Sequence, residues 1–264
     1  MEKIAIVKIG GQVIDDLREL DNFLKDFASL GGRKILVHGG GKWVSLMSER
    51  LGIKVKMIDG RRITDAETLE VVKMMLPGVA NKNIVAGLQK YGCDALGFTG
   101  ADGNMITARK RPVRENIDFG YVGDIVRIDA QKLTKIIELG LTPVFTAMTH
   151  DGNGSLLNTN ADTIASDLAV ELSAFFETDL YFCFEKPGVM SDLQDQNTLI
   201  TTLTKNIYEK YKTTGTIHSG MIPKIDNAFD ALGKGVSRIH ICHYRDIVNA
   251  GNPAKQLGTL IVDH

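Results

Sequence analysis

The sequence has few cysteines, prolines and tryptophans: three, six and one among 264 residues. Cys93, Cys183 and Cys242 lie far apart, and none belongs to a CxxC pair or a Cys/His cluster. This pattern argues against a disulfide framework and against a zinc site built from cysteine pairs. Free thiols of this kind are typical of proteins in a reducing compartment. We expect no metal site built by the protein itself.

The sequence also has no excess of charge and no long hydrophobic run. It carries 31 basic and 32 acidic residues, without a basic tail or stripe, so we expect no nucleic-acid partner. The first apolar run, Ile4–Ile9, is short and contains Lys8, unlike a signal peptide, and no run approaches the length of a membrane span. We therefore expect a cytoplasmic protein with no membrane partner.

Short apolar runs alternate with longer amphipathic segments along the chain. Strands are expected at 4–9, 34–38, 95–98, 142–146, 180–184 and 238–242, and helices at 17–30, 43–51, 66–91 with an interruption at Pro77-Gly78, 162–175, 203–211 and 221–232. Two polar-alternating stretches, 54–63 and 105–128, are typical of hairpins. Strands without alternation, separated by helices, predict an α/β fold with a mostly parallel sheet covered on both faces.

Glycines follow the first two expected strands. Gly10-Gly11 ends the first, and Gly39-Gly40-Gly41 ends the second. In parallel sheets, ligands collect beyond the carboxyl ends of the strands, and glycine there lets backbone N–H groups approach an anion at a helix start. The pattern therefore indicates a phosphate-binding edge.

Three common glycine motifs do not fit these turns. A P-loop fails because Gly41-Lys42 is followed by Trp43 and not by Ser or Thr. A dinucleotide fingerprint fails because Val44 stands where its third glycine belongs. The run His38–Gly41 resembles the oxyanion loop of esterases, but the sequence has no GxSxG nucleophile elbow.

Three polar features remain, and each has an ordinary alternative. Lys8 lies inside an apolar strand, where it binds either an anion or a structural carboxylate. The segment Asn158–Asp162 opens a helix; one Asn or Asp would suffice as a cap, and three such side chains exceed that need. Lys224, near the start of another helix, would on its own be a surface lysine.

Taken together, these segments resemble the amino-acid kinase family, in particular its acetylglutamate kinase branch. The resemblance covers essentially the whole chain in order. It rests on Lys8–Gly11, His38–Gly41, Asp59–Thr64, Asn81-Lys82, Gly100–Gly103, Gly120–Asp124, Asn158–Asp162 and Gly220–Lys224. Each segment alone is weak, whereas their combination in this order is highly specific.

The resemblance implies a three-layer αβα sandwich: a single amino-acid kinase domain over 1–264, with an acceptor-binding lobe at 1–170 and an ATP-binding lobe at 171–264. It implies phosphorylation of the side-chain carboxylate of N-acetyl-L-glutamate, or of another N-acylglutamate such as N-succinylglutamate, in arginine biosynthesis. The alternatives are a family member with another acceptor, or a non-catalytic regulatory relative. Intact Lys8, Asp162 and Lys224 count against the second.

The resemblance also implies roles for individual residues. Lys8 and Lys224 would contact the transferring phosphoryl group, Asp162 would orient both lysines, and the amides of Gly11 and Gly40 would hold its oxygens. The acceptor site would comprise Gly39, Gly40, Gly41, Arg62, Asn158 and Asn160, with Arg62 on the α-carboxylate. The nucleotide site would comprise Lys8, Gly10, Glu185, Gly188, Gly220, Met221 and Lys224.

This chemistry needs charge neutralisation but no general base, because a carboxylate acceptor is already ionised. The implied cofactor is ATP with Mg²⁺ carried by the nucleotide.

One departure from the family is Cys183–Gly188, where relatives commonly have Thr or Ser followed by Asp. The basic residues Arg109, Lys110, Arg111 and Arg114 form either a solvated loop or a contact to an extra acceptor carboxylate.

The resemblance also bears on assembly. Arginine-inhibited relatives are hexamers with a helix ahead of the first strand, and Lys8 stands only seven residues after Met1. We therefore expect a homodimer, with 66–91 at its interface, that is insensitive to arginine through that helix.

Overall fold

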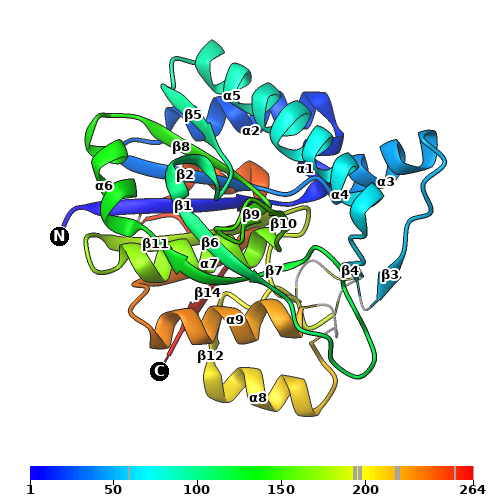
Figure 1. Ribbon diagram of the computed structural model, residues 1–264. Coiled ribbons are helices and arrows are strands. Elements are labelled where there is room, and N and C mark those ends of the chain that lie inside the picture. The colour runs from blue at the N-terminus through cyan, green and yellow to red at the C-terminus, as the bar shows by residue number, and fades with distance from the viewer. Residues whose placement is uncertain (59, 193–194, 196–197, 218–220, 253, 264) are drawn as a thin grey trace. The chain divides into compact units, whose positions relative to one another are not determined.

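The first strand of the chain pairs with strands from its last third (Figure 1). β1 (Lys3–Ile9) is parallel to β11 (Glu177–Phe184), and β11 is parallel to β13 (Arg238–His243). β14 (Thr259–Val262) is antiparallel to β13 and parallel to β12 (Thr202–Thr204). The strand order in this part is β12-β14-β13-β11-β1, with one antiparallel neighbour among four pairings.

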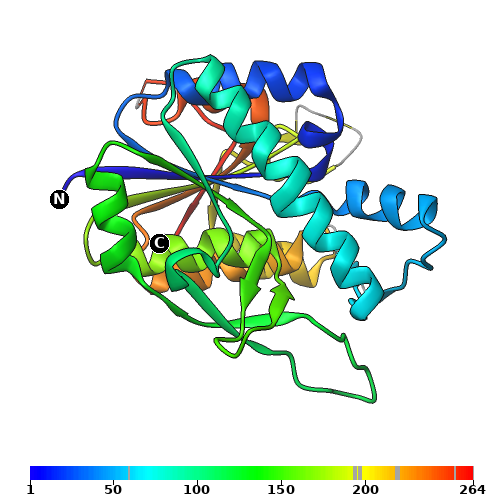
Figure 2. The ribbon, with the colours of Figure 1, turned by 45° about the horizontal axis from the view of Figure 1, so that its top comes forward.

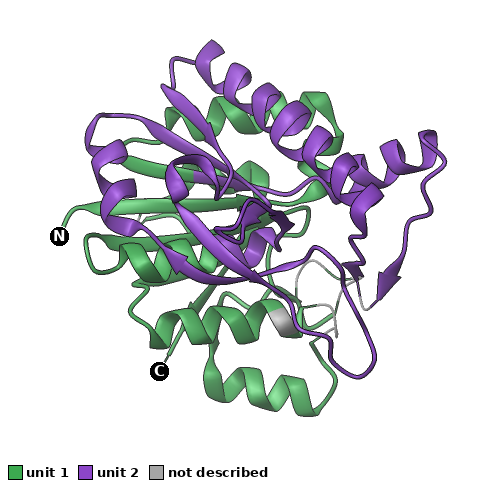
Figure 3. Cartoon of the chain, viewed as in Figure 1, with its two compact units in different colours: residues 1–35, 165–264 green, residues 36–164 purple. Residues whose placement is uncertain are grey.

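These strands belong to the first of two compact units (Figure 3). The computed structural model describes residues 1–264 except 59, 193–194, 196–197, 218–220, 253 and 264. Unit 1 comprises residues 1–35 and 165–264, and unit 2 comprises 36–164. The helical segments of unit 1 are α1 (Gly11–Asp15), α2 (Leu17–Ser29), α8 (Lys205–Thr213), α9 (Ile222–Gly233) and η4 (Tyr244–Asn249), and α7 (Ala161–Leu172) crosses the boundary.

Helix α2 shows how local sequence sets an element of unit 1. Asp16 caps it by accepting hydrogen bonds from the amides of Arg18 at 2.8 Å and Glu19 at 3.2 Å. Its apolar face buries Leu20, Phe23, Leu24 and Phe27. On η4, Tyr244 Oη lies 2.7 Å from Glu19 Oε2 and Arg245 Nη2 lies 2.6 Å from Glu19 Oε1, and these bonds fix α2 against η4.

Unit 2 contains a short parallel arrangement of its own. β2 (Arg33–His38), which crosses the unit boundary, is parallel to β8 (Thr142–Thr146), and β8 is parallel to β5 (Ala95–Phe98). Every residue of β8 is buried, as expected for a strand covered on both faces. The α-helices α3 (Gly41–Arg50) and α6 (Ala130–Glu138) also lie in this unit.

The long helix expected at 66–91 is one rod with a change of winding (Figure 2). α4 (Ala66–Lys73) passes into a π-helical segment, η1 (Met74–Ala80), and then into α5 (Asn81–Lys90). Pro77 lies inside η1 and has no N–H to donate, so the regular ladder is interrupted there. The expected interruption at Pro77-Gly78 is therefore confirmed, as a π segment within a continuous helix.

Antiparallel strands complete unit 2. β6 (Ile106–Lys110) pairs with β7 (Gly123–Ile128), next to β9 (Met148–His150) and β10 (Leu156–Asn158). A two-stranded hairpin joins β3 (Met57–Ile58) to β4 (Arg61–Arg62). Both hairpins expected from the sequence are confirmed.

Most expected elements agree with the structure to within a few residues, and the differences are local. The helix expected at 203–211 is wrong at its start, because Leu203 lies in β12 and Thr204 caps α8 by accepting from the Ile207 amide. α6, β9, β10, β12 and β14 were not expected. Within the described residues no helix is long and apolar enough to cross a membrane.

Candidate functional site

The first group of predicted site residues lies at the carboxyl ends of β1 and β11. Lys8 is half-buried in register with Phe182, and the Gly10 amide donates to the Cys183 carbonyl at 3.2 Å. A Cβ on Gly11 would meet no atom within 4 Å, and one on Gly10 would make only an ordinary 3.8 Å contact with Cys183 O. Packing within the protein does not require either glycine, which leaves room for a ligand.

Glu185 and Gly188 lie on the loop that follows β11. A Cβ on Gly188 would collide with Thr259 Oγ1, 2.6 Å away, and the neighbouring Val189 amide donates to the same hydroxyl at 2.8 Å. Close packing against β14 is therefore sufficient to require glycine at 188. Glu185 is exposed, and its charge acts to raise the pKa of His243, although burial has the larger effect and lowers it.

Met221 and Lys224 lie at the beginning of α9. Met221 is the residue before the helix, and its carbonyl accepts the Lys224 amide at 3.1 Å. Lys224 is half-buried. Gly220, the other predicted nucleotide-site residue of this segment, lies outside the described residues, as does Asp59 of the acceptor segment.

The glycine turn after β2 belongs to unit 2. Gly40 has φ +143°, a backbone conformation that favours glycine, and a Cβ there would lie 2.8 Å from Leu76 Cδ2 and displace that side chain. The turn leads directly into α3, whose Gly40 cap makes no side-chain hydrogen bond. Gly39 and Gly41 have no such constraint, because their Cβ positions are open or at 4.0 Å from Ala161.

Arg62 on β4 reaches the first turn of α3. Its Nη2 donates to the Gly41 carbonyl and to Ser45 Oγ, both at 2.8 Å. Its Nη1 is buried and has no hydrogen-bond partner among the described residues. Burial lowers the pKa of Arg62 from its usual value. The side chain is thus held at one nitrogen and offers the other to an anion.

Asn158, at the end of β10, forms a cluster with two neighbouring segments. Its Nδ2 donates to Thr64 Oγ1 at 3.0 Å, and its amide donates to the Tyr121 carbonyl at 2.9 Å. The Tyr121 amide in turn donates to the Thr64 carbonyl at 2.7 Å. Glycine is required at 120 because a Cβ there would collide with the Thr64 carbonyl. Thr64 is a contributor that the sequence motifs do not single out individually.

Asn160 and Asp162 begin helix α7. Asn160 Oδ1 accepts from the amides of Asp162 at 2.7 Å and Thr163 at 3.1 Å, which is the geometry of an N-cap. The ordinary capping interpretation therefore accounts for Asn160. It does not account for Asp162, whose Oδ1 atom is buried.

The sequence profile of the amino acid kinase family matches residues 3–243. The chain belongs to this family. It is 50% identical over 262 residues to the acetylglutamate kinase of Cytophaga hutchinsonii, covering 99% of both chains. It is 36% identical over 261 residues to that of Methanopyrus kandleri, covering 98% of this chain and 100% of the relative.

Solved structures agree on the fold of this amino acid kinase. N-acetylglutamate synthase from Neisseria gonorrhoeae, complexed with coenzyme A and N-acetyl-glutamate, matches with a TM-score of 0.84 at 22% identity, over 99% of this chain and 59% of that one. Carbamate kinase from Giardia lamblia bound to AMP-PNP matches with a TM-score of 0.73 at 11% identity, over 100% and 99%. The expected αβα class with a mostly parallel sheet is confirmed.

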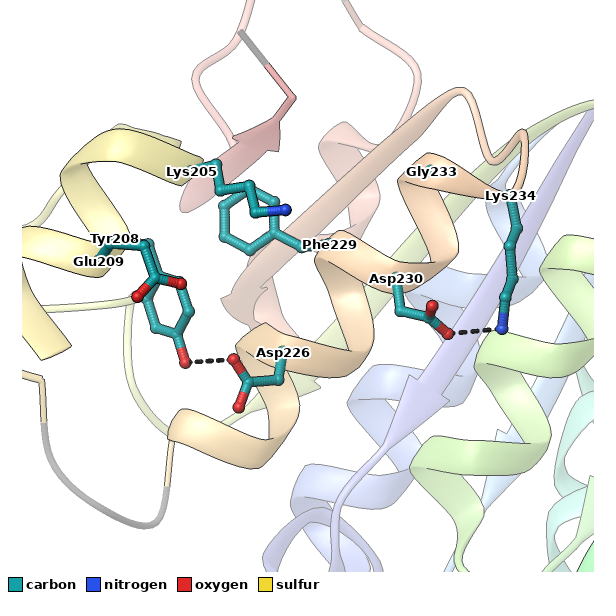
Figure 4. Close-up of a pocket in the computed structure, with 8 residues that line it drawn as sticks. All are labelled: Lys205, Tyr208, Glu209, Asp226, Phe229, Asp230, Gly233 and Lys234. Atoms are coloured by element: carbon teal, nitrogen blue, oxygen red, sulfur yellow. Dashed lines mark hydrogen bonds and ion pairs between the residues drawn. The ribbon is translucent and has the colours of Figure 1, made fainter.

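The amino acid kinase also contains a pocket whose lining includes none of the predicted residues (Figure 4). It has a volume of about 470 Å³ and lies between α8 and α9 of unit 1. Four of its polar side chains bind in pairs: Tyr208 Oη lies 2.7 Å from Asp226 Oδ1, and Lys234 Nζ lies 2.6 Å from Asp230 Oδ2. The lining is Lys205, Tyr208, Glu209, Asp226, Phe229, Asp230, Gly233 and Lys234.

Proposed function

We propose that this amino acid kinase transfers the γ-phosphoryl group of ATP to the side-chain carboxylate of N-acetyl-L-glutamate, in arginine biosynthesis. Relatives that match it along nearly their whole length are acetylglutamate kinases. The observation in the structure that carries the proposal is the half-buried guanidinium of Arg62, which no described carboxylate neutralises and whose Nη1 is without an acceptor.

Among the described residues, the guanidinium of Arg62 therefore lacks an anionic partner and an acceptor for its Nη1 hydrogens. Removing an arginine from water is costly unless an anion compensates for the lost hydration. Its planar fork can bind both oxygens of a carboxylate, and the contacts to Gly41 and Ser45 fix its orientation in advance. An acceptor α-carboxylate supplies the missing charge, and Asn158 is proposed to bind the acceptor nearby.

In unit 1, the residues fit a bound nucleotide. The open space beside Gly11 is where a phosphate is proposed to approach the backbone, and Lys8 and Lys224 are proposed to supply positive charge. Glu185, Gly188, Met221 and Gly220 complete the proposed nucleotide set. Mg²⁺ would arrive with ATP, bound mainly by phosphate and water, and would neutralise charge on the phosphates.

The proposed chemistry follows from the charges. An ionised carboxylate attacks without losing a proton, so the protein needs to bring two anions together and to neutralise the transferring group. Lys8, Lys224 and the amides of Gly11 and Gly40 are proposed for that task, together with the flanking glycines Gly39 and Gly41. Asp162 is proposed to orient the two lysines.

The acyl group is proposed to be acetyl. The loop that could recognise a second carboxylate has one of its charges already bound, since Arg111 Nη2 lies 2.7 Å from Asp124 Oδ1. Lys110 Nζ lies over the Tyr121 ring at 5.6 Å. These contacts favour an acyl group without a second carboxylate, and the turnover of N-succinylglutamate compared with N-acetylglutamate tests this.

Three further parts of the proposal concern organisation. The acceptor-binding lobe is assigned to 1–170 and the ATP-binding lobe to 171–264. The protein is proposed to be a cytoplasmic homodimer, with 66–91 at the interface, and to be insensitive to arginine. Hexamers in size-exclusion chromatography with light scattering would contradict the dimer.

An ADP-release assay tests the proposed function across glutamate, N-acetylglutamate, N-succinylglutamate, aspartate and carbamate. Turnover is expected with the acylated glutamates and foremost with N-acetylglutamate. Lys224→Ala, purified in parallel, shows how much ADP comes from a contaminating kinase. A folded, ATP-binding protein with no turnover on any N-acylglutamate would overturn the proposal.

A further inference from the structure

His38 is a fully buried histidine directly before the glycine turn, and the mechanism above gives it no role. It ends β2 in register with Thr146 of β8 and has no exposed surface. Its Nδ1 lies 2.8 Å from the Gly39 carbonyl oxygen, and its Nε2 lies 3.1 Å from Asn81 Nδ2. Asn81 Nδ2 also donates to the Val144 carbonyl at 2.9 Å.

These contacts determine which ring nitrogen carries the proton. The Asn81 amide nitrogen has two hydrogens, one for Val144 O and one for His38 Nε2. Nε2 must then accept, which places the single proton of a neutral ring on Nδ1, and Nδ1 donates to Gly39 O. Burial lowers the pKa of His38 to about 4, so the ring is neutral at physiological pH.

The fold makes room for Asn81 in particular. Asn81 is 1% exposed and follows the π segment η1, and its amide donates to the Leu76 carbonyl five residues earlier. A Cβ on Gly97 of β5 would collide with Asn81 Oδ1. The same π segment presents Leu76 to Gly40. Leu76 lies 36 residues after Gly40 and Asn81 lies 43 residues after His38, so the rod brings both side chains to the segment His38–Gly40.

A hydrogen bond to the Gly39 carbonyl also orients the next amide. In a trans peptide the C=O and N–H point in opposite directions, so holding Gly39 O toward His38 directs the Gly40 N–H away from the protein interior. No described residue accepts a hydrogen bond from that amide. Without a side chain at Gly39 or Gly40, the plane could otherwise rotate freely.

We propose that His38 and Asn81 are positioning residues, which lock the Gly39–Gly40 peptide so that the Gly40 N–H faces the transferring phosphoryl group. The inference rests on the proposed function. A donor fixed before the reaction begins stabilises developing charge without reorganising, which is where such amides gain their effect. Leu76 packs against Gly40 in the same peptide.

A matched pair of substitutions separates positioning from simple core packing. The amide nitrogen of asparagine can occupy the place of Nδ1, whereas that of glutamine can occupy the place of Nε2. His38→Asn keeps a donor to Gly39 O and should retain kcat within about threefold of the wild type. His38→Gln loses that donor and should lower kcat about 10- to 100-fold, with the KM for the acceptor little changed.

Two further measurements do not depend on how those variants fold. Nitrogen-15 NMR of the wild-type protein should show His38 protonated at Nδ1 and unprotonated at Nε2. Gly97→Ala, which leaves His38 and Gly39 unaltered but displaces Asn81, should lower kcat in the same way as His38→Gln. A proton on Nε2, or equal kcat for the Asn and Gln variants at normal thermal stability, would overturn the inference.

The same experiments keep this inference distinct from the proposed function. An active wild-type enzyme whose two His38 variants behave alike contradicts the positioning role alone. A wild-type protein without turnover on any N-acylglutamate contradicts the proposed function and, with it, the role of the Gly40 amide.

Discussion

Arg62 Nη2 and Ser45 Oγ are 2.8 Å apart, a contact that spans 17 residues of sequence and joins hairpin β3–β4 to the first turn of α3. The contact fixes one end of the guanidinium and leaves the buried Nη1 for an anion. It also links Arg62 to the glycine turn, because the same Nη2 donates to Gly41 O. Arg62 and the glycine turn are therefore held together within unit 2.

Arg62→Lys should raise the KM for the acceptor by about 10- to 100-fold while changing kcat much less. Lysine keeps the charge but lacks the fork that binds Ser45, Gly41 and a carboxylate together. Steady-state kinetics with both substrates varied provides the test, and the KM for ATP serves as the internal control. A variant with an unchanged acceptor KM would show that Arg62 does not bind the acceptor.

Lys8→Ala and Lys224→Ala should each lower kcat by about two to three orders of magnitude, since each removes charge from the transition state. Lys3→Ala is a matched control, because Lys3 lies on the same strand and its ammonium faces Glu177 at 3.4 Å. Single-turnover measurements at saturating substrates separate the chemical step from binding. Near-normal turnover in both active-site variants would mean that the assigned roles are wrong.

Gly11→Ala and Gly188→Ala should have opposite effects. A Cβ at 11 enters open space, so stability should hold while turnover or ATP binding falls, because the methyl group occupies space proposed for phosphate. A Cβ at 188 collides with Thr259 and Leu199 and should cost about 1–3 kcal/mol of unfolding free energy. Urea unfolding and ATP titration measure the two effects. Full activity in Gly11→Ala would argue against phosphate at that turn.

Acid should destabilise the protein through His38. The unfolded histidine titrates near 6.5 and the folded one near 4, so the unfolded state binds more protons between these values. The buried neutral ring contributes fully to the free energy of unfolding above pH 6.5. This contribution falls by about 3 kcal/mol as the pH drops to 4. Urea unfolding of the wild type and of His38→Asn at several pH values provides the comparison.

The difference in unfolding free energy between the wild type and His38→Asn isolates the contribution of His38 from those of other groups. Burial raises the pKa of Asp167 to about 6, which acts in the opposite direction: its contribution is present at low pH and is lost as the pH rises from 3.8 through 6. Asp167 is common to both proteins and cancels in the difference. A stability difference that does not change between pH 7 and pH 4.5 would contradict a depressed pKa for His38.

The parts of the fold predicted from sequence are those set by local patterns. Continuous apolar runs identified β1, β2, β5, β8, β11 and β13, because strands buried on both faces need no polar alternation. The short strands β9, β10, β12 and β14 carry only three or four residues each, too few for a periodic signal. The π segment was visible only as Pro77-Gly78, since winding is not encoded in any one residue.

The candidate site divides in the same way. Gly40 and Arg62 were identified from motifs, and the structure supplies a physical reason for each. Capping explains Asn160, and packing on Thr259 explains Gly188. The spacing of residues in the sequence could not distinguish these structural roles from ligand binding. The links of His38 and Thr64 to residues 43 and 94 positions away depend on the tertiary fold, so sequence alone could not reveal them.

Trapping the product with hydroxylamine tests the central claim most directly, because an acyl phosphate reacts with hydroxylamine to give a hydroxamate. With ATP, Mg²⁺ and N-acetylglutamate, we predict one γ-hydroxamate of N-acetylglutamate for each ADP released, and none with Lys8→Ala. Release of ADP without any hydroxamate, under conditions in which authentic acyl phosphate is trapped, would show that the phosphoryl group does not go to a carboxylate.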